Sequence, residues 1–139
     1  MMIILECKKS GLTCDISFRG FMEFRNDIAF LCDQEYGGHY AKLSDTIFVT
    51  SDTEDGLAKW QQTFDILRKK KNISSKIHHF LLLPDCDGCI SKAACIELLF
   101  LTQKLPDKYY GVIGRNCRKT QIELVLLECI SSNSSLVWY

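Results

Sequence analysis

Cys86 and Cys89 form the sharpest local motif of this 139-residue chain, a Cys-Asp-Gly-Cys sequence between two apolar segments. A thiol at a helix N-terminus has its thiolate stabilised by unpaired backbone amides, which is how thiol-disulfide oxidoreductases work. The motif therefore permits redox chemistry. A thioredoxin-like fold, however, would place the motif early in the chain, and no later cis-proline candidate follows it here. A small redox enzyme is the alternative interpretation.

The same two cysteines, together with His78, His79 and Cys95, could in principle ligate zinc. Structural zinc sites prefer paired ligands on loops or knuckles, and a second such cysteine pair is absent. The two histidines would point to opposite faces of a strand, so at most one could join a site. We therefore expect no metal.

Asp52, Glu54 and Asp55 follow an apolar segment at 45–50. Ligands of open α/β sheets bind beyond the carboxyl ends of the strands, so a metal site is one interpretation of these acids. The spacing from Ser51 to Glu54 is also that of a capping box, and acids at a helix start interact favourably with its dipole. We favour capping.

Other catalytic signatures are missing from the sequence. It has no Gly-x-Ser-x-Gly elbow, and the segment 111–114 is too short for a phosphate-binding fingerprint. None of the three histidines pairs with a nucleophile. We therefore predict no catalytic residues and no cofactor.

Basic residues gather at Arg115, Arg118 and Lys119, just before a predicted helix. Cations oppose the dipole at that end, so they need another reason to be there. A contact with a phosphate backbone is one reason, and a solvated loop is another. The chain has 17 basic and 17 acidic residues, so its net charge gives no general attraction to nucleic acid.

The composition is that of one globular domain, 1–139, with 47% hydrophobic and 24% charged residues. No apolar run is long enough to span a membrane, and no export signal is visible. The eight cysteines are scattered through apolar segments, which favours buried free thiols in the nucleus or cytosol.

Apolar spacing predicts the elements that would position these residues. We expect strands at 3–7, 28–32, 45–50, 77–83 and 109–113, and a turn at Gly37-Gly38. We expect a helix around 18–24 and another from 53 to 71, whose stripe of Leu57, Trp60, Phe64 and Leu67 would pack on the sheet. We expect a helix from 89 or 90 to 105 with one inward face, made of Ile90, Ala94, Leu98, Leu101 and Leu105. A last helix is expected from 119 to 129, with Ile122, Val125, Leu126 and Cys129 inward. Three consecutive strand–helix units favour an open, mainly parallel sheet of four to five strands with helices on both faces.

The order of elements from 45 to 129 resembles the nuclease domain of the XPF family. The similar stretches are TIFVTSD, LAKWQQTFDILRKKK, HHFLLLPD, AACIELLFLTQKLP, YYGVIGRN and KTQIELVLLEC. Non-catalytic relatives, namely a small Fanconi-associated protein and small meiotic crossover proteins, are similar over IAFLCDQEYGGHYAKLSDTIFVTSD as well.

Active members of that family carry a Glu-Arg-Lys triplet whose acid helps to hold the catalytic metal. This chain has Val49-Thr-Ser-Asp52 instead, and it lacks the tandem helix-hairpin-helix region. The resemblance therefore implies a pseudo-nuclease. It implies a heterodimer with a related subunit, in a nuclear complex of DNA repair or meiotic recombination. A signalling adaptor of the TIR type is a further alternative, because TIFVTSD followed by a tryptophan is similar to part of that domain.

The last four residues, Leu136, Val137, Trp138 and Tyr139, are large and apolar or amphipathic, whereas chain ends are usually polar. They either fold back as an edge strand or fill a pocket on a partner. Aromatic side chains are common anchors of interfaces, so these residues are the predicted contact with the partner.

Overall fold

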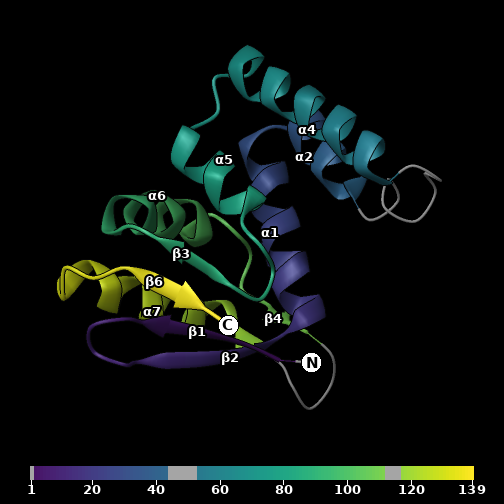
Figure 1. Ribbon diagram of the computed structural model, residues 1–139. Helices are drawn as coiled ribbons and strands as arrows, with labels where there is room; N and C mark the ends of the chain where they lie inside the picture. Colours follow the sequence, from purple (N-terminus) through teal and green to yellow (C-terminus); the bar gives the residue numbers. More distant parts are fainter. Residues whose placement is uncertain (1, 44–52, 112–116) are drawn as a thin grey trace.

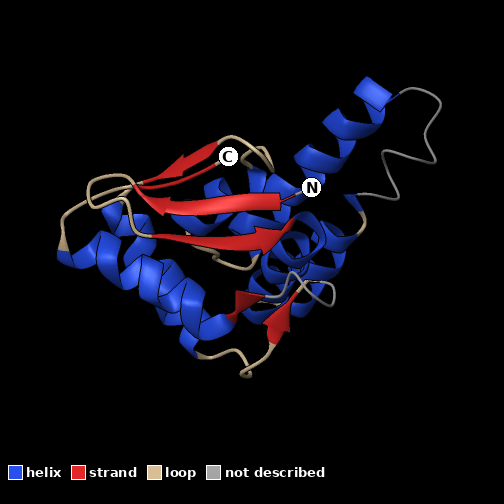
Figure 2. Ribbon diagram, turned by 90° about the horizontal axis from the view of Figure 1, so that it is seen from below, coloured by secondary structure: helices blue, strands red, loops and turns tan. Residues whose placement is uncertain are grey.

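A four-stranded antiparallel sheet in the order β2–β1–β6–β3 forms one side of the molecule (Figure 1). This computed structural model describes residues 2–43, 53–111 and 117–139. Figure 2 shows the four strands side by side, with a short separate hairpin. The sheet strands are β1 (Met2–Cys7), β2 (Thr13–Ser17), β3 (Gly88–Ile90) and β6 (Leu136–Trp138), and the hairpin is β4 (Tyr109–Tyr110) with β5 (Cys117–Arg118).

One face of this sheet is buried. Ile3, Leu5 and Cys7 alternate along β1 with residues that water reaches, which is the expected pattern for a strand with one covered face. Helices α1 (Phe18–Cys32) and α7 (Lys119–Ser131) contact the sheet, and α6 (Lys92–Gln103) packs against α7.

Helices α2 (Gln34–Ala41), α4 (Thr53–Lys70) and α5 (Ser75–Leu82) form a second group at the end of α1 (Figure 1). The predicted stripe of α4 is largely buried there, but it does not pack on the sheet. The Phe64 ring stacks on Tyr36 with centroids 4.4 Å apart, and Trp60 stacks on His39 at 5.4 Å. The expectation that the stripe lies on the sheet is therefore wrong, because aromatic residues of α2 provide its packing surface.

The predicted parallel sheet is wrong as well, because every strand pair of the described chain is antiparallel. The predicted strand at 77–83 is helix α5, which begins where the Ser74 hydroxyl accepts a hydrogen bond from the amide of Lys76. The predicted strand at 28–32 is the last part of α1, and the Gly37-Gly38 turn lies inside α2. The predicted strand at 45–50 lies outside the described residues.

Other predicted elements are confirmed. They are β1, the helix α1 around Phe18 to Phe24, α4, and α7 with Ile122, Val125, Leu126 and Cys129 buried. Helix α6 begins at Lys92 rather than at 89 or 90, because 88–90 is strand β3. Across the described ranges, none of the helices is both long and apolar enough to cross a membrane.

Candidate functional site

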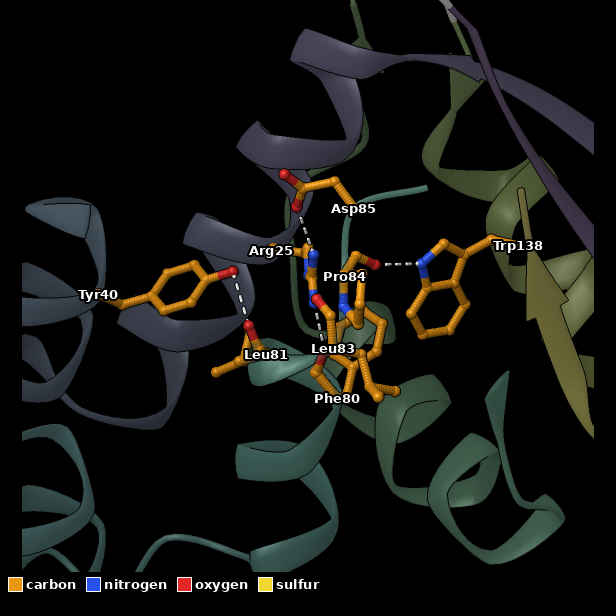
Figure 3. A network of polar contacts seen from close by, with 8 residues as sticks. All are labelled: Arg25, Tyr40, Phe80, Leu81, Leu83, Pro84, Asp85 and Trp138. Carbon is orange, nitrogen blue, oxygen red and sulfur yellow. Dashed lines mark hydrogen bonds and ion pairs between the residues drawn. The ribbon is translucent and has the colours of Figure 1, made fainter. Parts of the chain in front are cut away.

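The guanidinium of Arg25, a residue that is 1% exposed, lies at the centre of a polar network (Figure 3). Its Nη2 donates to the carbonyl oxygens of Phe80 at 2.5 Å and Leu83 at 2.6 Å. Its Nη1 donates to Asp85 Oδ1 at 2.8 Å. The last carbonyls of a helix have no partner within the helix, so Arg25 caps the C-terminal end of α5.

Two further side chains complete this cap. Tyr40 donates its hydroxyl hydrogen to the carbonyl of Leu81 at 3.1 Å, and Trp138 Nε1 donates to the carbonyl of Pro84 at 2.9 Å (Figure 3). The donors come from the consecutive helices α1 and α2 and from β6, which lies far from both in sequence. The network therefore joins the helical group to the sheet, and its role is structural.

A second hydrogen-bonded chain runs through His78. Its Nε2 lies 2.7 Å from Asp65 Oδ1, and its Nδ1 lies 2.7 Å from the Tyr36 hydroxyl. Burial lowers the pKa of His78, although the contact with Asp65 opposes this. Burial also raises the pKa of Tyr36, whose side chain has no exposed surface. The order acid–imidazole–hydroxyl resembles a catalytic relay, but no substrate can reach this phenol.

The cysteines are all free thiols. Cys86 and Cys89 are exposed, and Cys89 lies in β3. The N-cap of α6 is Ser91, whose hydroxyl accepts from the amide of Ala94 at 3.2 Å. The cysteines therefore do not occupy the helix start that motivates the redox interpretation.

Cys7 is the other candidate nucleophile. Burial opposes its ionisation, but the hydroxyl groups of Ser10, Ser132 and Ser134 outweigh this and lower the pKa of Cys7 to about 6. The thiol is fully covered, so it is activated but inaccessible. Within the three described ranges, no group of three or more potential ligands is arranged to hold a metal.

Two of the residues predicted to contact DNA form ion pairs with acidic residues of the same chain. Arg118 Nη2 pairs with Asp107 at 2.8 Å, and Lys119 Nζ lies 3.1 Å from Glu123. Arg115 lies outside the described residues. Of the acids at the predicted helix start, Asp52 lies outside them, the side chain of Glu54 is not described, and Asp55 pairs with Lys59 at 3.4 Å.

The structure places Leu136–Trp138 in the sheet as β6, and the backbone of Tyr139 exchanges two hydrogen bonds with Ile4. Leu136 and Trp138 are buried in the core, whereas Val137 is half-buried and Tyr139 is exposed. They fold back as a strand, but β6 is an inner strand, bonded to β1 and β3. Contact of this segment with a partner stays a prediction, and only Val137 and Tyr139 present surface for it.

A groove of about 420 Å³ near α5 and α6 was not predicted from the sequence. Its lining is mixed. The apolar part consists of Ile73, Ile77, Ile96, Phe100 and Leu101, and Lys71, Asn72, Ser74 and Glu97 also line it. Ile96 is 48% exposed and Phe100 is 59% exposed. The signal was present, because these two residues are four apart and lie off the inward stripe of α6.

Comparison of the chain with family models, with curated proteins and with solved structures finds no match.

Proposed function

We propose that this chain is a non-catalytic binding module that associates with another protein through the groove near α5 and α6. The observation that carries this proposal is the exposure of Ile96 and Phe100 on the wall of that groove. Large apolar side chains that cluster at a surface hollow mark interaction sites in soluble proteins. Aromatic side chains are the usual anchors because they bury a large area with few rotatable bonds.

Polar groups at the edge of the groove complete the composition of a protein interface. Lys104 Nζ lies 4.2 Å from the centre of the Phe100 ring. Glu97 accepts a hydrogen bond from the Ser74 hydroxyl at 2.9 Å. Interfaces typically have an apolar centre surrounded by a polar rim.

The candidate catalytic groups support a non-catalytic role. Tyr36 and Cys7 are covered, and the pKa of Cys32, which lines the groove, is raised to about 11 by burial and by Asp33. A thiol with this pKa stays protonated at neutral pH, so it is a poor nucleophile.

The resemblance to the XPF family suggests the identity of the partner. It would be a related subunit in a nuclear complex of DNA repair or meiotic recombination. DNA contact through Arg115, Arg118 and Lys119 would be a secondary property. The antiparallel sheet differs from the mainly parallel sheet that we expected with this resemblance, so the partner's identity rests on the sequence pattern alone.

The test compares Phe100→Glu with Leu124→Glu, an equally drastic change at a residue of α7 that is 58% exposed and does not line the groove. Each tagged variant is used for affinity purification from the native cells, alongside the unaltered protein. We expect Phe100→Glu to lose a stoichiometric partner while keeping its melting temperature, and Leu124→Glu to keep both. Retention of the partner by Phe100→Glu would refute the groove as the interface.

The non-catalytic part of the proposal has its own assays. We expect no cleavage of branched or single-stranded DNA with magnesium or manganese, and no reduction of insulin disulfides. Nuclease activity that Asp52→Ala abolishes would contradict the pseudo-nuclease interpretation. Reductase activity lost in a Cys86→Ser, Cys89→Ser double variant would favour the redox enzyme instead.

A further inference from the structure

Two buried thiols from distant parts of the sequence touch each other. Cys14 lies in β2 and Cys117 in β5, 103 positions apart, and their Sγ atoms are 3.7 Å apart. Both side chains are buried, and β2 and β5 contact each other. Two sulfurs in van der Waals contact between neighbouring backbone segments are well placed to form a covalent bond.

We propose that Cys14 and Cys117 are a redox modification site, at which a peroxide forms a disulfide between β2 and β5. A disulfide has its sulfurs about 2.0 Å apart, so the two atoms must approach by roughly 1.7 Å. Side-chain rotation and a small backbone shift supply a movement of this size. A small oxidant is required because the thiols are covered, which excludes a bulky disulfide such as oxidised glutathione as the direct reagent.

The chemistry balances with hydrogen peroxide as the oxidant. One of the two thiols ionises and its sulfur attacks a peroxide oxygen, which breaks the O–O bond and gives a sulfenic acid and hydroxide. The other sulfur then attacks the sulfenic sulfur, forming the S–S bond and releasing the second oxygen as water. The two protons lost from the thiols complete the two waters. In total, two thiols lose two electrons and one peroxide gains them.

The disulfide would constrain the fold where β5 joins helix α7. β5 leads directly into α7, a helix that contacts the sheet. Linking β5 to β2 therefore fixes the start of α7 to the outer strand of the sheet. Because the bond closes a long loop, it removes many conformations of the unfolded chain. We expect the melting temperature to rise by on the order of 10 °C.

The experiment uses the Cys86→Ser, Cys89→Ser variant, because those two exposed thiols would react first. The variant is treated with hydrogen peroxide, digested without reduction, and mapped by mass spectrometry. We expect one cross-linked pair of peptides, containing Cys14 and Cys117, and a raised melting temperature that dithiothreitol reverses.

The same treatment is applied after adding Cys14→Ala and, as a matched control, Cys95→Ala, another buried cysteine. The Cys14→Ala protein should lose the temperature rise and the Cys95→Ala protein should keep it. The map of the parent variant does not depend on whether either substitution folds. Absence of the Cys14–Cys117 peptide, or a different pairing such as Cys95 with Cys129, would overturn the proposal.

Discussion

Substituting Arg25 by methionine tests whether the cap of α5 stabilises the fold. The substitution keeps an apolar chain of similar length but leaves the carbonyl oxygens of Phe80 and Leu83 without their charged donor. Hydrogen bonds to a charged group contribute roughly 1.5–3 kcal/mol each. Loss of both bonds from Arg25 Nη2 therefore costs about 3–5 kcal/mol, toward the lower end of their summed range. We therefore expect Arg25→Met to lower the free energy of unfolding by about 3–5 kcal/mol.

A substitution at Asp85 distinguishes the contribution of the ion pair from that of the hydrogen bonds to the carbonyls. Its side chain is 43% exposed, so water screens its ion pair with Arg25. Such pairs contribute about 0–1 kcal/mol, and Asp85→Asn should therefore cost no more than that. Arg19 lies on the same helix but is exposed, and Arg19→Met should change stability by no more than about 0.5 kcal/mol.

Urea unfolding followed by circular dichroism measures all three variants, and a constant slope with denaturant shows that the unfolding transition is unchanged. The expected order of loss is Arg25→Met, then Asp85→Asn, with Arg19→Met nearly neutral. A cost for Asp85→Asn equal to that of Arg25→Met would show that the ion pair dominates and that capping of the carbonyls does not. A cost below about 1 kcal/mol for Arg25→Met would refute the reasoning altogether.

Three further predictions concern other parts of the fold. Trp60→Ala should cost about 3–5 kcal/mol in urea unfolding, as for a buried large aromatic side chain, and a much smaller loss would contradict its place in the core. Burial and Arg68 lower the pKa of His78, whereas Asp65 acts in the opposite direction. As the pH falls, His78 is therefore protonated in the unfolded state before it is protonated in the folded state. Stability should therefore fall as the pH drops below about 6.5, and the part due to His78 should vanish in His78→Gln, as urea midpoints at pH 7 and 5.5 would show. Deleting residues 136–139 should lower the melting temperature strongly, whereas an unchanged value would mean that β6 does not belong to the sheet.

Predictions from the sequence succeeded where one helix face or one strand face is apolar. The stripes of α4 and α7 and the alternation of β1 each specify both the type of element and its buried side. The apolar run at 77–83 was ambiguous, since a short continuous run suits a buried strand and a buried helix equally. Tertiary contacts decided it, because Tyr40 and Arg25 provide donors for the end of a helix.

The role of glycine also depends on tertiary contacts that a sequence does not show. Gly37 was expected in a turn, yet a Cβ there would collide with the backbone of Phe30 on α1. The residue therefore allows α1 and α2 to pack closely, and a single sequence does not distinguish this use of glycine from a turn. Likewise, Gly88 in β3 leaves room for the ring of Trp138, because a Cβ there would collide with that ring. The need for glycine is evident only once β6 is known to pair with β3.

The inner position of β6 has a consequence for synthesis of the protein on the ribosome. β1 is made long before β6, so its second neighbour in the sheet is not available until the chain has been extended past Trp138. β3 also waits for β6, its neighbour in the sheet, but for a shorter time, because β3 is made much later than β1. Domains of many proteins begin to fold while the rest of the chain is still being made. Here, β1 and β3 remain without that shared neighbour until β6 has been made. In that interval the nascent chain exposes strand edges that chaperones could bind or that could pair prematurely.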